Sequence, residues 1–234
     1  PAVSFRGVDI AYGDAPPFVS GFDLKIRPGQ VIALTGASGT GKSSLLHLFL
    51  GLSPLTAGEV EVDGHPLSRH GDWCGQIGWM GQATVVVPGT LADNIALSQT
   101  GASRDLIRAT AEQAGLTLDL DRRIDERGGG LSGGERRRCE IARALAANPS
   151  IMLLDEPFAA VDPHTVEELQ SQVRTLAKQG IAILLTDHNV QQTLRICDRA
   201  YILGDGRLIA EGAPQQLLDN EVVRRVYLGP DFRL

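Results

Sequence analysis

A glycine-rich stretch followed by a lysine and two serines is the part of this sequence best suited to hold an anion. Residues 36–44 read Gly-Ala-Ser-Gly-Thr-Gly-Lys-Ser-Ser and follow the apolar run Val31 to Leu34. Glycines at 36, 39 and 41 allow positive φ and a close approach of the backbone N–H groups to a ligand. A helix predicted to begin after them would direct its positive end at the same point. The pattern G-x-x-x-x-G-K-S therefore predicts a phosphate-binding loop between a buried strand and a helix.

Two side chains of this loop have separate expected roles. Lys42 would reach the β- and γ-phosphates of a nucleoside triphosphate, and the Ser43 hydroxyl would bind Mg²⁺. A glycine-rich turn with an incidental lysine is the alternative. We disfavour it because every fixed position of the motif is met.

Two carboxylates end a second predicted strand. The apolar run Ile151 to Leu154 precedes Asp155 and Glu156, which puts both acids at the edge where open α/β sheets bind ligands. Asp155 would hold Mg²⁺ through its hydration shell, and Glu156 would polarise a water for attack on the γ-phosphorus. Simple surface charge is the alternative, and the apolar residues before the acids argue against it.

Three further side chains are candidates for the same site. His188 follows the predicted strand Ile181 to Leu185, where it would hydrogen-bond the γ-phosphate and orient Glu156. Gln82 begins a loop, where its carbonyl would ligate Mg²⁺ or hold the attacking water, although a surface glutamine is the commoner reading. Tyr12 would either stack on adenine or be a partly buried loop aromatic.

The pentapeptide Leu131-Ser-Gly-Gly-Glu135 predicts the start of another helix. Ser132 is a suitable N-cap and Glu135 follows three residues later, as in a capping box. The positive end of that helix suits a phosphate as well as an ordinary cap. For the arginines 136–138, contact with lipid headgroups or a partner is one reading, and a solvated helix face is the one we favour.

Composition bounds the class of protein. With 234 residues, 43% of them hydrophobic, the chain can bury one large core or a core with a subdomain. A net charge of −6 and a pI near 5.4 argue against a broad nucleic-acid-binding surface and leave a local basic patch as the alternative, so nucleic acid is not the expected partner. The 3 cysteines lack CxxC spacing, which predicts neither a disulfide framework nor a zinc site and fits a reducing cytosol.

The sequence also bears on the membrane and on the chain ends. No apolar run approaches the roughly 20 residues that span a bilayer, and no charged-then-apolar leader opens the chain. Any membrane contact is therefore expected to be peripheral. The start at Pro1 without methionine fits trimming, excision from a longer polypeptide or an expressed fragment.

Periodicity and turn residues predict the elements around these motifs. Strands are expected at 3–10, 22–26, 31–34, 58–64, 77–80, 151–154, 181–185, 199–203 and 207–211. Helices are expected at 43–50, at 91–120 with an interruption near 98–103, from 133 through 146, at 163–178 and across 214–227. The first two strands are expected to be antiparallel beside a core sheet, and Asp63-Gly64 to close a hairpin. The predicted fold class is α/β.

The order of the motifs resembles the nucleotide-binding domain of ABC transporters over nearly the whole chain. The phosphate loop, Gln82, Leu131 to Glu135, Ile151 to Glu156, Ala159-Ala-Val-Asp162 and His188 follow one another as in that family. The resemblance implies a P-loop NTPase of ABC ATPase fold, with a mixed core sheet, an antiparallel β-subdomain and a helical subdomain. It implies one domain over 1–234. Its core and β-subdomain would cover about 1–90 and 128–234, and the helical subdomain about 91–127 plus the signature helix from about 131.

The resemblance also implies roles for residues. ATP-contacting positions are Tyr12, Gly36, Ser38, Gly39, Gly41, Lys42, Ser43, Ser44, Gln82, Ser132, Gly133, Gly134 and Asp162. Mg²⁺ would be held by Ser43, Gln82 and Asp155, and Lys42, Glu156 and His188 would act in catalysis. Ser132, Gly133 and Gly134 look like the signature that closes over ATP bound to the other protomer, and Asp162 like the aspartate at the dimer seam.

The implied protein is an Mg²⁺-dependent ATPase at the cytoplasmic face of the inner membrane. It would form a homodimer on binding ATP and power transport through a transmembrane permease subunit or a fused transmembrane segment. A non-transport ABC ATPase of DNA repair or translation is an alternative, but the long insertions, tandem domain or basic surface that it predicts are absent. A domain that binds nucleotide without useful turnover is a further alternative.

The two parts of the chain resemble different branches of the family. Residues 82–95 and 125–128 resemble domains fused to exporter membrane segments, particularly the cytochrome bd assembly exporter of thiols. Residues 135–149, 186–190 and 225–234 resemble the stand-alone ATPase of lipopolysaccharide export. This predicts a chimera, natural or engineered, joined near Leu131 to Glu135, which would bind nucleotide without coupled transport.

Overall fold

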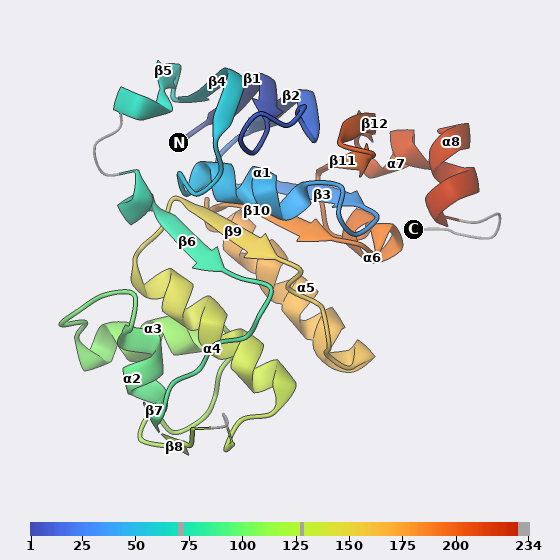
Figure 1. Ribbon diagram of the computed structural model, residues 1–234. Coiled ribbons are helices and arrows are strands. Elements are labelled where there is room, and N and C mark those ends of the chain that lie inside the picture. Colours follow the sequence, from blue (N-terminus) through green and yellow to red (C-terminus); the bar gives the residue numbers. More distant parts are fainter. Residues whose placement is uncertain (70–72, 127–128, 229–234) are drawn as a thin grey trace.

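The computed structural model describes residues 1–69, 73–126 and 129–228 (Figure 1). Arg127 and Gly128 of the exporter-like motif, and residues 229–234 of the ending, lie outside this part of the chain. The strands are β1 (Val3–Ile10), β2 (Val19–Ile26), β3 (Val31–Gly36), β4 (Leu55–Val62), β5 (His65–Pro66), β6 (Ile77–Met80), β7 (Gly89–Thr90), β8 (Arg123–Ile124), β9 (Ile151–Asp155), β10 (Ala182–Asp187), β11 (Arg199–Gly204) and β12 (Arg207–Gly212). The helices are α1 (Lys42–Phe49), α2 (Leu91–Ala96), α3 (Arg104–Gln113), α4 (Gly133–Ala146), α5 (Pro163–Lys178), α6 (Val190–Leu194), α7 (Pro214–Leu218) and α8 (Glu221–Val223), with short turns η1 (Leu67–Arg69), η2 (Cys74–Gln76) and η3 (Arg224–Leu228).

Two sheets organise the molecule. The core sheet has the order β12-β11-β3-β10-β9-β6, in which β12 is antiparallel and the other strands are mutually parallel. The second sheet, β2-β1-β4-β5, is antiparallel throughout and lies over the core sheet and α1 (Figure 1). The predicted α/β class, mixed core sheet and antiparallel strands are confirmed.

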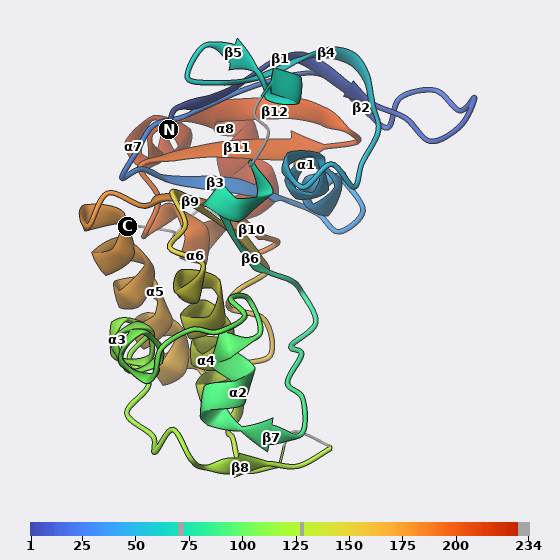
Figure 2. The ribbon, with the colours of Figure 1, turned by 90° about the vertical axis from the view of Figure 1, so that its left-hand side faces the viewer.

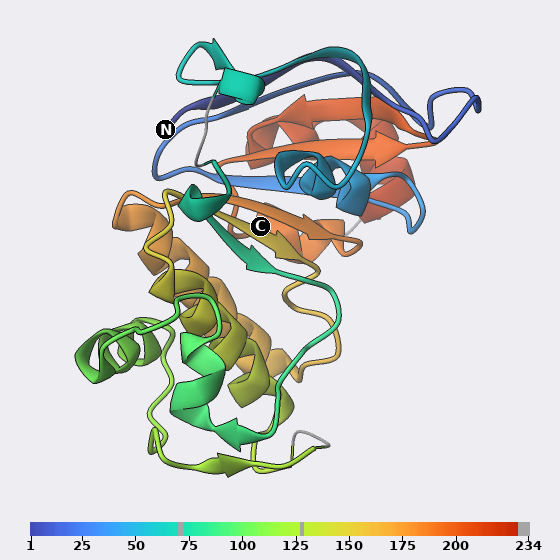
Figure 3. The same cartoon turned by 60° about the vertical axis from the view of Figure 1, so that its left-hand side comes forward.

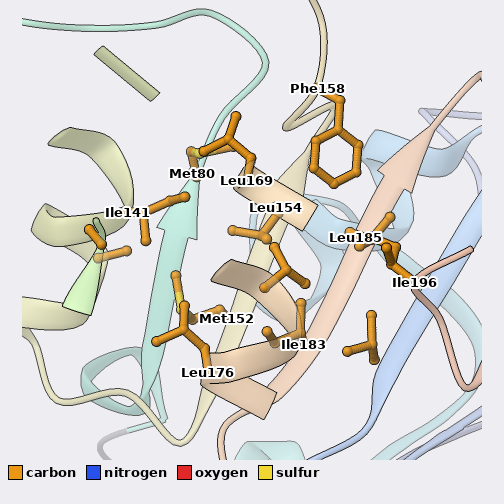
Figure 4. Close-up of a cluster of buried hydrophobic side chains, with 14 of the residues drawn as sticks. Met80, Ile141, Met152, Leu154, Phe158, Leu169, Leu176, Ile183, Leu185 and Ile196 are labelled. Carbon is orange, nitrogen blue, oxygen red and sulfur yellow. The ribbon is translucent and has the colours of Figure 1, made fainter. Parts of the chain in front are cut away.

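The apolar core strands bury side chains on both faces of the core sheet. Along β3, Val31 and Ala33 pack into the cluster that α4 and α5 cover, whereas Ile32 and Leu34 pack into the cluster shared with α1 and the antiparallel sheet. Figure 4 shows the first cluster, in which strand residues meet α4 and α5 side chains such as Ile141. Because successive strand side chains point to opposite faces, a continuous apolar run fills both layers. The carboxyl ends of these strands are thereby fixed side by side.

The helices α2, α3 and α4 pack together on the side of the core sheet away from β1 and β2 (Figure 2). The expected interruption between two helices is present, but α3 ends at Gln113, so the buried Leu116 and Leu120 pack from a loop. Gly89–Thr90 pairs with Arg123–Ile124 as a two-stranded ribbon that the sequence did not suggest. The proposed limits of the helical subdomain stay a prediction.

The segment from β6 to α2 runs along α4 (Figure 3) and connects the core sheet to the helices. It contains Gln82. In the described residues, no helix has both the length and the apolar character required to traverse a bilayer.

Candidate active site

The phosphate loop connects β3 to α1 as expected. Gly36 has φ of 142°, and a Cβ atom there would lie 2.1 Å from the carbonyl oxygen of Leu203 on the adjacent strand. Gly41 has φ of 94°, and a Cβ atom there would lie 2.5 Å from a methyl of Val19. Both approaches are closer than any Cβ atom tolerates, so these two positions require glycine for space as well as for backbone conformation.

Lys42 folds back over this loop. Its Nζ atom donates to the carbonyl oxygens of Gly36 at 2.9 Å and Ala37 at 2.8 Å, and the residue is only 5% exposed. Burial lowers the pKa of Lys42, while the carboxylates of Glu156, Asp155 and Asp187 act in the opposite direction. The ammonium is therefore held inside the loop by carbonyl groups and faced by acids at the strand ends.

Asp155 is joined to the phosphate loop by a direct hydrogen bond. Its Oδ1 atom accepts from the hydroxyl of Ser43 at 3.1 Å and from that of Thr186 at 2.5 Å. The Asp155 side chain lies at the end of β9, and Thr186 lies opposite it on β10. The structure thus brings Ser43 and Asp155 together as predicted and adds Thr186, which the sequence analysis missed.

Glu156 lies at the centre of the remaining candidates. Its backbone has φ of 49°, which is uncommon for a residue with a side chain. Its N–H donates to both the Oγ1 atom of Thr186 at 3.1 Å and the carbonyl oxygen of that residue at 3.2 Å. Its Oε2 atom accepts from Gln82 Nε2 at 3.2 Å and lies 3.5 Å from His188 Nδ1. Gln82, Glu156 and His188 therefore converge, as the sequence predicted.

A hollow of about 320 Å³ opens in front of this cluster. Its lining comprises Phe18, Ser38, Gly39, Gly41, Lys42, Ser43, Ser44, Gln82 and Glu156. Phe18 is a residue that sequence reasoning missed. It stacks on Tyr12, with ring centroids 5.3 Å apart and an interplanar angle of 10°, and Tyr12 is 53% exposed. The adenine contact proposed for Tyr12 stays a prediction, and one face of the Tyr12 ring is already taken by Phe18.

The signature residues lie elsewhere, at the start of α4. Ser132 and Glu135 form the predicted capping box, with Ser132 N–H donating to Glu135 Oε2 at 2.6 Å and Glu135 N–H donating to Ser132 Oγ at 3.3 Å. These bonds lower the pKa of Glu135. Neither Ser132 nor Gly133 nor Gly134 is among the residues that line the hollow in the same chain.

Asp162 lies near the signature and not in the hollow. It caps α5, where its Oδ1 accepts from Thr165 N–H at 3.0 Å and its Oδ2 from Thr165 Oγ1 at 2.6 Å. A Cβ atom at Gly134 would lie 2.5 Å from the Thr165 methyl, so the starts of α4 and α5 adjoin. Asp162 and the signature therefore share one surface of the chain.

One expectation about the arginine run was wrong. Arg137 does not belong to a solvated helix face: it is 4% exposed, and it forms an ion pair with Glu140 at 3.2 Å. Arg138 pairs with Glu168, and Arg136 donates to the carbonyl oxygen of Leu131 at 3.2 Å. The spacing of Arg137 and Glu140, i and i+3 on a helix, is the signal that was available in the sequence.

Mg²⁺ would find oxygen ligands here. The hydroxyl of Ser43, the carboxylate of Asp155 and the amide oxygen of Gln82 form an oxygen-only set, which suits Mg²⁺ bound through few protein groups and substrate phosphates. Within the described ranges, no group of three or more His, Cys, Asp and Glu side chains could hold a metal ion by itself. The donor set therefore fits a metal that arrives with nucleotide.

Comparison with known proteins decides the family. Residues 19–159 match the model of the ABC transporter family, which spans the phosphate loop, the signature and both acids. The chain belongs to the ABC transporter family. It is an ATP-binding domain and an ATPase.

Relatives of this ABC domain are similar over most of its length. It is 39% identical over 224 residues to the lipopolysaccharide export system ATP-binding protein LptB of Haemophilus influenzae, covering 92% of each chain. The LptB protein of Escherichia coli K12 is 40% identical over the same length, also covering 92% of each chain. Because these identities are averages over both parts of the chain, the proposed join near Leu131 to Glu135 stays a prediction.

A solved structure shares the fold. A bacterial Atm1-family ABC exporter with ATP bound superposes with a TM-score of 0.84 at 29% sequence identity, over 99% of this chain. The ABC domain spans 43% of that exporter chain. The predicted ABC ATPase fold is confirmed.

Proposed function

We propose that this domain hydrolyses ATP with Mg²⁺ and does so as a two-fold dimer. The observation that carries the proposal is the convergence of side chains that follow four core strands, β3, β6, β9 and β10. Ser43 bonds to Asp155 at 3.1 Å, and Gln82 and His188 both approach the same carboxylate oxygen of Glu156. Charge stabilisation and positioning are what phosphoryl transfer requires of a protein.

Glu156 is the proposed general base. Its carboxylate would accept a proton from the attacking water as the water oxygen bonds to the γ-phosphorus, and the bond from that phosphorus to the β,γ-bridging oxygen breaks to release ADP. His188 would hold Glu156 in orientation, and Lys42 would turn from the carbonyls of Gly36 and Ala37 to the phosphates. Mg²⁺, held by Ser43, Asp155 and Gln82, would supply charge neutralisation when bound.

The dimer is proposed because one chain lacks part of the site. Ser132, Gly133 and Gly134 lie outside the lining of the hollow, so in this proposal they close over the ATP of a second copy. In the usual two-fold homodimer, each copy presents the same surface to the other. The signature of each copy would then face the hollow of its partner. Tyr12 and Asp162 are assigned to the adenine contact and the dimer seam within the same proposal.

The proposed physiological role is to power transport through a membrane permease. The relatives support it, since LptB is the ATP-binding protein of a lipopolysaccharide export system and the protein of similar structure is an exporter. On this basis we infer a transmembrane partner, a peripheral location at the cytoplasmic face of the inner membrane, and lipopolysaccharide export as the transport class.

Glu156→Gln tests the proposal. We expect ATP turnover to fall by about 10²- to 10⁴-fold, as for removal of a positioned general base, while the Kd for ATP changes little. Glu167→Gln, at an exposed position of α5, is the control. Turnover that rises faster than linearly with protein concentration would support the dimer. Unchanged turnover in Glu156→Gln would refute the assignment.

A further inference from the structure

One buried guanidinium donates to three backbone carbonyl groups on two segments of the site. Arg137 Nη1 donates to the carbonyl oxygen of Gly81 at 3.2 Å, and its Nη2 donates to those of Gln82 at 3.0 Å and Glu156 at 3.4 Å. Arg137 lies in the second turn of α4, the helix that packs against β6. A single side chain therefore bonds the backbone of both Gln82 and Glu156 to the helix that begins with the signature.

The contacts use the particular chemistry of arginine. Its planar fork offers several N–H groups in fixed directions, whereas a lysine ammonium is a compact point charge on a flexible stem. The fourth partner, Glu140 Oε2 at 3.2 Å, balances the buried charge. Glu140 Oε1 in turn accepts from Val85 N–H at 3.0 Å, so the pair also grips the loop beyond Gln82.

The backbone of Glu156 needs such support. Its φ of 49° places it in a sparsely populated region, which persists only where the surroundings impose it. Thr186 holds its N–H, and Arg137 holds its carbonyl oxygen. The same Nη2 atom also donates to the Gln82 carbonyl oxygen. Arg137 therefore fixes the backbone spacing between Gln82 and Glu156, whose side chains meet at 3.2 Å.

We propose that Arg137 is a positioning residue for hydrolysis, which fixes the relative placement of Gln82 and Glu156 and couples both to α4. The inference rests on the proposed role of Glu156. It assigns Arg137 no contact with ATP, since Arg137 is absent from the lining of the hollow. A merely structural ion pair would affect stability, whereas a positioning residue affects kcat selectively.

Arg137→Lys is the principal test, because it keeps the charge opposite Glu140 and loses the fork. We expect kcat to fall by about 10- to 100-fold, the range for a misplaced catalytic group, with KM within about twofold. ATP affinity, measured by titration in the Glu156→Gln background, should not change. Arg143→Lys is the matched control, since Arg143 also donates from α4 to backbone carbonyl oxygens, those of Asn94 and Val85, but has no bond to Gln82 or Glu156; its kcat should stay within about twofold of the parent.

A double variant separates positioning from folding. Arg137→Met with Glu140→Gln leaves no unpaired buried charge, so the fold should survive, but kcat should be as low as in Arg137→Lys. Wild-type kcat in either folded variant would overturn the inference, and so would loss of the fold in both, which would make Arg137 a structural residue. If Glu156→Gln alone kept full turnover, the proposed function would fail instead.

Discussion

Thr186 provides the sharpest test of how the strand ends are joined. Its hydroxyl donates to Asp155 Oδ1 at 2.5 Å and accepts from Glu156 N–H at 3.1 Å. Thr186→Val conserves the shape of this fully buried residue and removes both bonds. Glu156 N–H keeps the Thr186 carbonyl at 3.2 Å, so the main loss is the bond to the carboxylate.

A buried hydrogen bond to a charged group contributes about 1.5–3 kcal/mol, so Thr186→Val should lower the free energy of unfolding by about 2–3 kcal/mol. For a domain of this size, that corresponds to a fall in Tm of about 4–12 °C. Urea and thermal unfolding followed by circular dichroism measure both quantities. Thr186→Ser keeps the hydroxyl and should lose less than half as much.

Two results would refute this reasoning. If Thr186→Val were as stable as the parent, the bond to Asp155 would contribute nothing. If Thr186→Ser, which keeps the hydroxyl, were destabilised as much as Thr186→Val, the methyl group would contribute as much stability as the hydroxyl, against the expectation that the bond to Asp155 dominates.

Three further predictions concern buried groups. Thr35 Oγ1 is fully buried and has no hydrogen-bond partner among the described residues. Thr35→Val should therefore raise the free energy of unfolding, measured in urea, by about 1 kcal/mol. A free energy of unfolding below that of the parent would show that the hydroxyl has a partner. Burial raises the pKa of Asp187 above its ordinary 3.8. The stabilisation that comes from this shift is therefore complete below pH 3.8 and is lost as the pH rises through the raised pKa. Over this pH range, the free energy of unfolding of Asp187→Asn should therefore fall less than that of the parent chain. Parallel pH profiles for the variant and the parent would contradict this. Burial raises the pKa of Cys139 to about 11 and that of Cys197 to about 12, whereas Cys74 is exposed. A maleimide at neutral pH should therefore label Cys74 alone in the folded chain. A second adduct in the mass spectrum would contradict this.

The sequence predicted those parts of the fold that depend on local pattern. The strand before the phosphate loop, the capping box at Ser132 and the α5 helix at Pro163–Lys178 follow from periodicity and cap chemistry, and each is confirmed. The meeting of Ser43 with Asp155 was predictable because both follow parallel strands, whose carboxyl ends share one edge.

Contacts between distant segments were not predictable in the same way. From the sequence alone, Arg137 resembles a surface arginine. Most of its partners are backbone carbonyl groups, such as those of Gly81 and Gln82, and no sequence pattern predicts that this loop packs against α4. Phe18 enters the hollow from a loop with no periodicity of its own. The strands β7 and β8 have only 2 residues each, which is too short to show the alternation of apolar and polar residues that predicts a strand.

Titration calorimetry with ATP and Mg²⁺ tests the central claim most directly. That claim is that the loop at 36–44 holds the phosphates of ATP beside Asp155 and Glu156. We predict a saturable heat with one site per chain in the parent, and at least a tenfold weaker Kd in Lys42→Ala, about 1.4 kcal/mol of lost binding free energy. Circular dichroism would verify that the variant is folded. No saturable heat in the parent, or equal affinity in folded Lys42→Ala, would contradict the account.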